Sequence, residues 1–538
     1  MSRNRTRASN KTARDYSDVP LPSIDRSVFD RSISHQTTFN AGELIPIDRE
    51  ELLPGDSITI QPAAFARTTT LEVPIFSNVY MDIHYFAVPL RLIWENSEEF
   101  FGAEPGGPGT RVDHFTPKLD MTTATGENVA PGTLHDYIGI PPNVRPGSTA
   151  DCPHNLYGRA YNLIYNEWYR DGELNGLVQV DTDDGTDAVS DYVILKRNKQ
   201  RDRFTSARPW PQKGPDVDIP LGTTAPVISD GSPIEFAQSP AGGSVRFRSL
   251  PATGFQAGQT WPAVFDLTFG ASTGLQADLS SAAAASVQDL RTAIATQHLF
   301  EMFSRAGSAR YVELNHTVWG VRGSDMRLQR PEYLGGTTAK LYVNPVQDTA
   351  GIVVGSGGQA VGNLGAFGVA MGAGRPFTYS AEEHCVLLGI ASVRTPYLYS
   401  EGIDKDLMRN DRFDYAWPQF QNVGEQPIYN RELFWSGTSA DQDVFGYEPR
   451  YQEYRERYNR VSSLMRPQVP DTLAYWHLGQ EFGATQNLNG AFIEENPPFD
   501  RVTTINQSIQ PTFKADFFVK SRMARPLSAQ GHPGLKRL

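Results

Sequence analysis

The sequence predicts a mainly β protein, and more specifically a β-sandwich whose strands are separated by long insertions. Strand-like runs lie far apart along the 538 residues, whereas only two or three segments have a helical pattern. The 47 glycines and 38 prolines are spread along the chain, which indicates many turns and irregular connections. A jelly roll is the commonest β-sandwich that carries large insertions in its loops. We therefore expect one large, elaborated core.

The N-terminal segment is predicted to be an irregular arm that covers residues 1–40. It is polar, and Pro20 and Pro22 would interrupt a helix. Its first part contains no acidic side chain, and its cations are Arg3, Arg5, Arg7, Lys11 and Arg14. Because no apolar stretch follows these cations, we do not expect a secretory signal.

Polarity patterns predict the first strands of the core, whose first part covers residues 41–213. Residues 57–60 follow a turn at 53–56 and alternate polar with apolar side chains, as in a half-buried strand. Residues 79–88 are apolar on both faces, and Pro89 ends the run. Apolar residues on both faces are typical of a sheet that further protein covers.

The clearest helix is predicted at residues 155–171. Tyr157, Tyr161, Ile164 and Trp168 recur there at steps of three and four residues, which places them on one helical face.

A sharp change of composition marks residues 214–285, which are dominated by Gly, Ala, Ser, Thr and Pro. We expect a variable surface insertion there, because long surface loops add little entropic cost. A short strand is predicted before it, at 192–195, and a helix after it. This helix runs to about residue 304, with Ser286 as its N-cap and Asp289 three positions later, as in a capping box.

The remainder of the core is predicted to cover residues 286–521. Residues 311–319 have a strand-like pattern, and residues 349–376 are rich in glycine and are expected to form a loop. Residues 385–393 are continuously apolar, as in a buried strand. Residues 513–521 alternate with a period of two and form the last predicted strand.

The charges are placed unevenly along a chain whose net charge is −12. Residues 522–538 are predicted to be a basic tail, with Arg522, Arg525, Lys536 and Arg537 as its cations. Basic ends on an acidic body suit termini that face phosphate groups while the body faces water. The alternative, that both tails are simply solvated, stays open.

No catalytic residue, metal site or cofactor is predicted. Residues 270–274 fit a G-x-S-x-G pattern, but they lie where glycine and serine are abundant. Residues 355–360 approximate a dinucleotide fingerprint without the helix and the acidic residue that it requires. Cys–His neighbours at 152–154 and 384–385 have no metal-binding spacing. No apolar run approaches eighteen residues, so no membrane-spanning helix is expected.

Short motifs follow one another in a fixed order along nearly the whole chain. The first four are FNAGELIP at 39–46, LPGD at 53–56, PLRLIW at 89–94 and RAYNLIYNEWYRD at 159–171. The later ones are RPWPQKG at 208–214, LQRPEYLGG at 328–336, VFGY at 444–447 and FIEENPP at 492–498. The ordered set resembles the major capsid proteins of microviruses (Microviridae), especially the gokushovirus branch. Residues 214–285 match no motif and coincide with the variable insertion of that family.

The resemblance implies an eight-stranded viral jelly roll with very long insertions between its strands. It also implies a T=1 icosahedral shell of sixty copies around a circular single-stranded DNA genome. The insertion at 214–285 would then form a protrusion at the threefold axes and contact a host receptor. Because sixty basic tails on an acidic body fall far short of the genome's charge, we expect a small, strongly basic packaging peptide as a partner. A minor pilot protein is a further expected partner, and assembly is expected in the bacterial cytoplasm.

A Tyr- and Arg-rich segment is the candidate for contacts between subunits. Its residues are Tyr447, Arg450, Tyr451, Tyr454 and Arg455, and these residue types are enriched in protein interfaces. Packing within one chain is the alternative role for the same side chains.

A β-sandwich glycoside hydrolase and a carbohydrate-binding module are the alternative functions. A monomer with hydrolytic activity would favour the enzyme, whereas megadalton particles would favour the shell protein.

Overall fold

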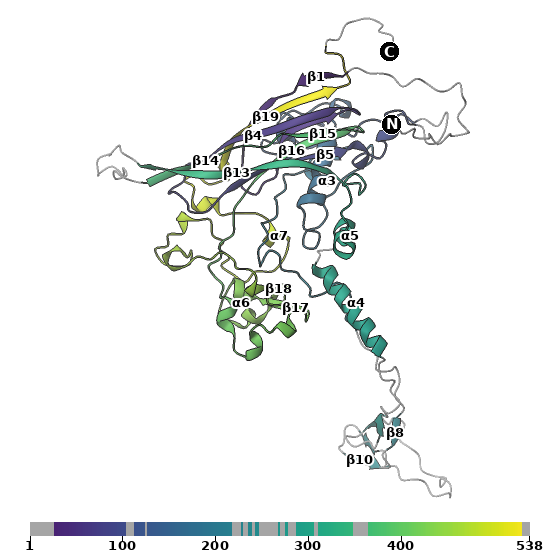
Figure 1. Ribbon diagram of the computed structural model, residues 1–538, viewed down its shortest axis with the longest axis vertical. Helices are drawn as coiled ribbons and strands as arrows, with labels where there is room; N and C mark the ends of the chain where they lie inside the picture. The colour runs from purple at the N-terminus through teal and green to yellow at the C-terminus, as the bar shows by residue number, and fades with distance from the viewer. Residues whose placement is uncertain are drawn as a thin grey trace, which may run out of the picture. The chain divides into compact units, whose positions relative to one another are not determined.

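The computed structural model describes residues 26–103, 112–123, 126–217, 287–305, 310–347 and 364–529, together with the backbone of five short strands between 227 and 277. The chain divides into two compact units. One unit consists of Met1–Pro211 and Arg305–Leu538, and the other consists of Gln212–Ser304. The larger unit contains the main sheet (Figure 1).

Eight strands of the larger unit form a jelly roll. Row 1 has the antiparallel order β2-β19-β4-β15, and row 2 has the antiparallel order β3-β16-β5-β13. Their bounds are β2 Ile33–Phe39, β3 Ile45–Leu52, β4 Ser57–Thr68, β5 Tyr80–Pro89, β13 Glu332–Gln347, β15 Phe377–Ser380, β16 Cys385–Arg394 and β19 Phe513–Arg525. Along the chain, row 1 holds the first, eighth, third and sixth of these strands. This interleaving is that of a jelly roll and confirms the predicted fold.

The two rows join into one curled sheet of ten strands. β14 (Leu364–Ala373) makes the connection, because it pairs with both β13 and β4. β1 (Ser27–Asp30) extends row 1 by pairing with the end of β19. Apolar side chains from both rows meet inside the curl and form the main hydrophobic core.

The outer face of row 2 is covered by the connection from β5 to β13. α3 (Leu156–Ile164) continues as a π-helical turn, Tyr165–Tyr169, and its apolar face packs on Phe86, Val88 and Ile390. The helix predicted at 155–171 is therefore confirmed. Figure 1 shows that α3, α6, α7 and the β17–β18 hairpin lie on the same side of the curled sheet.

The insertions of the larger unit contain short elements. The helices besides α3 are α1 Ser97–Phe100, α2 Leu134–Ile138, α5 Tyr311–Trp319, α6 Asn430–Leu433 and α7 Gly490–Ile493. The strands outside the jelly roll are β6 Leu119–Asp120, β7 Asp187–Ala188, β17 Glu425–Tyr429 and β18 Val444–Pro449. Most of these elements are too short to be stable alone, so their position depends on side-chain packing.

Several strands agree with the sequence analysis, and one is longer than expected. The strands predicted at 57–60, 79–88 and 385–393 lie within or nearly coincide with β4, β5 and β16. The strand predicted at 513–521 is β19, which continues to Arg525. Arg522 and Arg525 therefore belong to a strand of row 1, and not to the basic tail in which the sequence analysis placed them.

Three other local predictions are wrong. Residues 27–39, expected to be part of the irregular arm, form β1 and β2 because β19 offers them a strand to pair with. Residues 311–319 form the helix α5 instead of a strand. Residues 192–195 form no strand, although the Leu195 carbonyl accepts a hydrogen bond from the Leu44 amide.

The glycine-rich loop expected at 349–376 contains a strand, because residues 364–373 are β14. The glycines permit close packing. A Cβ atom at Gly368 would lie 2.7 Å from the Leu341 side chain, and one at Gly336 of β13 would lie 2.2 Å from the Ile83 carbonyl oxygen. Glycine in this sheet therefore marks the close approach of neighbouring groups instead of the end of a strand.

The smaller unit contains short strands and one long helix. β9 (Glu235–Gln238) pairs with β10 (Gly243–Arg246) and β11 (Leu267–Phe269), and β8 (Val227–Ser229) pairs with β12 (Leu275–Ala277). α4 (Val287–Arg305) agrees with the predicted helix. The predicted N-cap, Ser286, and the G-x-S-x-G pattern at 270–274 lie outside the described residues.

Candidate subunit interface

The connection from β16 to β19 forms a small module with its own hydrophobic core. Its centre is the β17–β18 hairpin, in which Ile428 and Phe445 are buried. They pack with Phe204 from the β5–β13 connection and with Phe492 of α7. Chain segments that are far apart in the sequence therefore meet under this hairpin.

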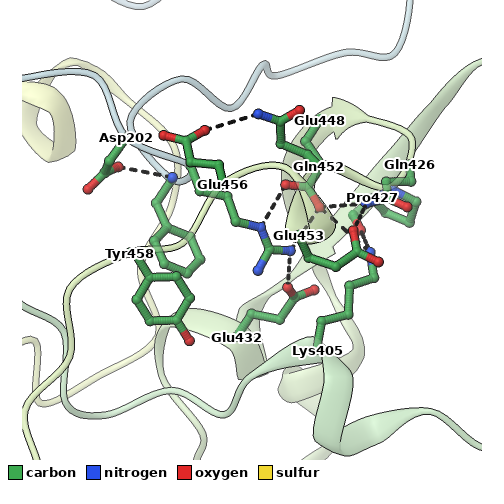
Figure 2. A network of polar contacts seen from close by, with 12 residues as sticks. Asp202, Lys405, Gln426, Pro427, Glu432, Glu448, Gln452, Glu453, Glu456 and Tyr458 are labelled. Atoms are coloured by element: carbon green, nitrogen blue, oxygen red, sulfur yellow. Dashed lines mark hydrogen bonds and ion pairs between the residues drawn. The ribbon is translucent and has the colours of Figure 1, made fainter. Parts of the chain in front are cut away.

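A buried ion network fixes the hairpin in place (Figure 2). The Arg203 guanidinium donates to both carboxylate oxygens of Glu448 at 2.8 Å and to Glu432 at 2.5 Å. The Gln426 side-chain amide donates to Glu448 and to Glu453, both at 2.7 Å. All three side chains of the central Arg–Glu–Glu group are almost completely buried.

The network is close to electrically balanced. Lys405 lies 3.7 Å from Glu448 and donates to the Pro427 carbonyl, so two cations face two carboxylates. Burial raises the pKa of Glu432 above its ordinary value, although Arg203 and Lys405 oppose this shift. Burial alone would lower the pKa of Arg203. Its hydrogen bonds to Glu448 and the charge of Glu432 outweigh burial, so this pKa lies above its ordinary value. Because every central charge has a partner, the network positions a rigid hairpin.

Of the five predicted contact residues, Tyr447 lies in β18 of this hairpin and the other four follow it, and they differ in exposure. Tyr447 is half-buried, and its backbone exchanges two hydrogen bonds with Arg208. Tyr451 is buried at a φ of 64°, and the Arg450 guanidinium lies over its ring. Tyr454 and Arg455 are exposed. The structure thus places Arg450, Tyr451, Tyr454 and Arg455 in one turn after β18, and of these four Tyr454 and Arg455 are exposed.

A second exposed segment adjoins this turn and was not singled out in the sequence analysis. We call residues 407–423 the aromatic loop. Every residue from 410 to 423 is exposed, and the large apolar side chains of the loop are Leu407, Phe413, Tyr415, Trp417, Phe420 and Val423. Such density of exposed apolar side chains marks an interaction surface on a folded protein.

The aromatic loop is held by its own hydrogen bonds. The Asp414 carboxylate accepts from the amides of Asn410 and Asp411, which lowers its pKa. The Trp417 indole donates to the Arg412 carbonyl at 2.8 Å. Arg409 lies over the rings of both Tyr415 and Tyr454, which links the loop to the predicted contact turn. The loop therefore presents its aromatic rings in a defined arrangement.

The predicted DNA-facing residues separate into three groups. Arg522 is exposed on β19. Arg525 donates to the buried carboxylate of Asp56 at 2.8 Å, so its charge is neutralised within the chain. The other seven, Arg3, Arg5, Arg7, Lys11, Arg14, Lys536 and Arg537, lie outside the described residues. The role predicted for Arg525 therefore does not fit its position.

The part of the chain that the structure describes contains neither a candidate metal site nor a membrane-spanning helix. No group of three or more His, Cys, Asp or Glu side chains there could hold a metal ion. Cys152 and Cys385 are buried in different hydrophobic cores. Among the same residues, no helix is long and apolar enough to cross a membrane.

A jelly roll with long insertions and an exposed, ordered aromatic loop offers large surfaces for contacts with other proteins. The chain belongs to the family of phage capsid proteins (F protein), which it matches over residues 17–535. It is 36% identical over 528 residues to the capsid protein VP1 of Bdellovibrio phage phiMH2K, which covers 96% of this chain and 97% of that protein.

Two further relatives carry the same name. The capsid protein VP1 of Chlamydia phage 1 is 33% identical, with 97% of this chain and 98% of that protein covered. The capsid protein VP1 of Spiroplasma virus 4 is 32% identical, with 98% and 99% covered. The resemblance to microvirus capsid proteins is thus confirmed. The family and these relatives are structural capsid proteins and not enzymes, which places the protein in the virion.

Proposed function

We propose that this protein assembles with copies of itself into a closed T=1 icosahedral shell of sixty subunits, which encloses a circular single-stranded DNA genome. The observation that carries the self-assembly is the aromatic loop, an ordered and exposed apolar surface on a chain of the capsid family. A closed shell requires heterologous contacts whose rotations close into rings. Permanent interfaces of this kind commonly bury more than about 2,000 Å².

The aromatic loop and the turn at Tyr454 and Arg455 supply suitable side chains for such a contact. Trp, Tyr, Phe and Arg dominate the energetically important positions of protein interfaces. The buried Arg203 network holds the hairpin below them rigid, so little conformational entropy is lost when a neighbouring subunit binds.

Assembly of purified protein tests the proposal. We expect the unaltered chain to form megadalton particles, measured by light scattering and electron microscopy. Replacing Tyr415, Trp417 and Phe420 together with serine removes most of the exposed aromatic surface of the loop. We expect this variant to raise the protein concentration needed for particles by about tenfold or more, because interface aromatics often contribute over 1 kcal/mol each.

Leu177→Ser is the matched control, since Leu177 is an isolated exposed apolar residue outside the loop. It should assemble as the unaltered chain does. Equal assembly of the triple serine variant would remove the aromatic loop from the interface. A chain that stays monomeric at high concentration without any substitution would contradict the shell itself.

The insertion at 214–285 is proposed to contact the host. It lies entirely within the smaller compact unit, Gln212–Ser304. Deleting about residues 216–284 should leave particle assembly intact and abolish attachment to host cells, measured by adsorption. Loss of particles after the deletion would count against this placement.

The basic termini are proposed to face the packaged DNA, together with a small basic packaging peptide, and a minor pilot protein is a further proposed partner. Assembly is proposed to take place in the bacterial cytoplasm. Replacing Arg3, Arg5, Arg7, Lys11 and Arg14 with serine should lower the DNA content of each particle more than it lowers solubility. Unchanged DNA content, measured by absorbance, would remove that role from the arm.

A further inference from the structure

The outer face of row 1 is exposed and carries a cluster of cations. Arg67 on β4 and Lys514, Lys520 and Arg522 on β19 all point outward, because they alternate with buried residues of the same strands. None of the four forms an ion pair with another residue that the structure describes. We call this surface the basic face.

One pair of these cations is unfavourable for an isolated chain. Lys514 and Arg67 are direct cross-strand partners, and like charges that lie opposite each other destabilise a sheet. Lys520 and Arg522 follow on the same side of β19, so the cationic row extends for roughly 27 Å at about 3.4 Å per residue. The only acidic residues in register with this row are Asp516 and, opposite Arg522, Asp30. Cations therefore outnumber acids on this face, although the whole chain is acidic.

Two phenylalanines lie among the cations. Phe65 and Phe518 are each 49% exposed. Phe65 pairs with Asp516 and Phe518 pairs with Ala63, so the two rings are diagonal neighbours near the middle of the face. Exposed aromatic rings flanked by cations can stack on bases while the cations neutralise phosphates, which is how proteins bind single strands without reading their sequence.

Both chain ends leave the sheet beside the basic face. Ser27 of β1 pairs with Arg525 of β19, so the segment that precedes β1 and the segment that follows β19 start at neighbouring positions. These segments contain the basic residues Arg3 to Arg14 and Lys536 with Arg537. The two segments that contain these further cations therefore begin at the edge of the face.

We propose that the basic face binds single-stranded DNA, with Arg67, Lys514, Lys520 and Arg522 on phosphates and Phe65 and Phe518 against bases. The proposal rests on the proposed function and names the part of the folded subunit that would line the inside of the shell. It adds a surface of row 1 to the two termini that are proposed to face the DNA. An acidic protein is the competing ligand, and competition by polyglutamate distinguishes it from DNA.

Binding of a thirty-nucleotide oligothymidylate to the purified full chain, kept below the concentration at which particles form, tests the proposal. Fluorescence anisotropy is measured over a series of salt concentrations. The double variant Lys520→Thr, Arg522→Thr should flatten the slope of log affinity against log salt by about 1.4, since each phosphate contact to a single strand contributes about 0.7. Threonine suits an exposed strand position and preserves the fold. Phe65→Ser and Phe518→Ser should each weaken binding about fivefold or more at an unchanged slope.

The control is Arg322→Thr with Arg327→Thr, which removes two exposed cations from the segment between α5 and β13. The proposal would be overturned if this control had an equal effect or if the slope of the Lys520 and Arg522 variant did not change. It would also be overturned if polyglutamate competed for the protein as strongly as unlabelled oligothymidylate does. Particle formation by each variant is measured separately by light scattering. Failure of the basic face alone leaves particles whose Lys520 and Arg522 variant keeps the unaltered salt slope, whereas failure of the proposed function leaves no particles.

Discussion

The two outer faces of the jelly roll differ in a way that follows from their connections. In β5 of row 2 nearly every residue is buried, whereas β4 of row 1 alternates between buried and more exposed residues. The long connection from β5 to β13 begins and ends in row 2, and it packs over that row. A strand covered on both sides needs apolar residues on both sides. The difference teaches that row 2 supports the insertions, while row 1 keeps an exposed outer face.

The largest expected effect on stability comes from removing one aromatic ring from the outer face of row 2, which we call the covered face. The Phe86 ring lies 5.7 Å from Trp168 of the π-helical turn and 5.5 Å from Tyr333 of β13, so it joins the insertion to the sheet. Phe86→Ala should lower the free energy of unfolding by about 3–5 kcal/mol, because it leaves a cavity. Urea denaturation followed by tryptophan fluorescence measures this loss.

Phe518→Ala is the matched control on the basic face. The same truncation there should change the free energy of unfolding by less than about 1 kcal/mol, because half of the side chain already contacts solvent. If both substitutions destabilise the protein equally, the outer face of row 1 is covered in solution, and the contrast between the rows is wrong.

Lowering the pH should destabilise the packing of the covered face more than it weakens DNA binding by the basic face. His135 of α2 is buried, and burial lowers its pKa from 6.5 to about 4. A histidine with a lowered pKa stabilises the fold fully above pH 6.5, and this contribution is lost as the pH falls towards 4. The loss should amount to roughly 3 kcal/mol at 1.36 kcal/mol per pH unit. Melting temperatures measured between pH 7 and pH 4 follow it.

His135→Leu should flatten this pH dependence, because leucine has no proton to bind. The cations of the basic face keep their charge over the same range, so oligothymidylate binding by a still folded chain should not weaken. An unaltered pH profile in the leucine variant would show that another group controls the acid response.

Two arginines of β19, three residues apart, should give opposite results. Arg525 bonds the Asp56 carboxylate, whose side chain is completely buried. Arg525→Thr should cost about 2–3 kcal/mol of stability, because it leaves a buried charge without its partner, and it should leave DNA affinity unchanged. Arg522→Thr should leave stability unchanged and weaken DNA binding at low salt. A stable Arg525 variant would mean that Asp56 finds another partner or binds a proton.

The regular strands could be predicted because their side chains follow simple patterns. The alternation in β19 and the continuous apolar run in β16 reflect one buried face and two buried faces. α5 was mistaken for a strand because its sequence is rich in Val, Tyr and Trp, residue types that favour strands, and none of its residues is buried. β14 was missed because its glycines serve close packing against β13 and β4, which a local pattern does not reveal.

The candidate site was less accessible to prediction, since its key contacts are remote in the sequence. The Tyr- and Arg-rich turn was found from its composition. Arg203, however, is separated by 229 residues from Glu432 and by 245 from Glu448, so nothing near it in the sequence indicates the network. The basic face combines β4 with β19, and only their register brings Arg67 beside Lys514.

The smallest expected effect distinguishes binding from stability at a single residue. Lys514→Thr removes the like-charge repulsion with Arg67 and introduces a residue that favours strands, so it should raise the free energy of unfolding by about 0.2–0.5 kcal/mol. Lys340→Thr is the control, because Lys340 is an exposed lysine on β13 whose cross-strand partner is the neutral Tyr80. Denaturation measured beside oligothymidylate affinity should show more stability and weaker binding for Lys514→Thr alone. A variant that loses stability would mean that Lys514 supports the fold, and the argument that its charge serves a ligand would no longer hold.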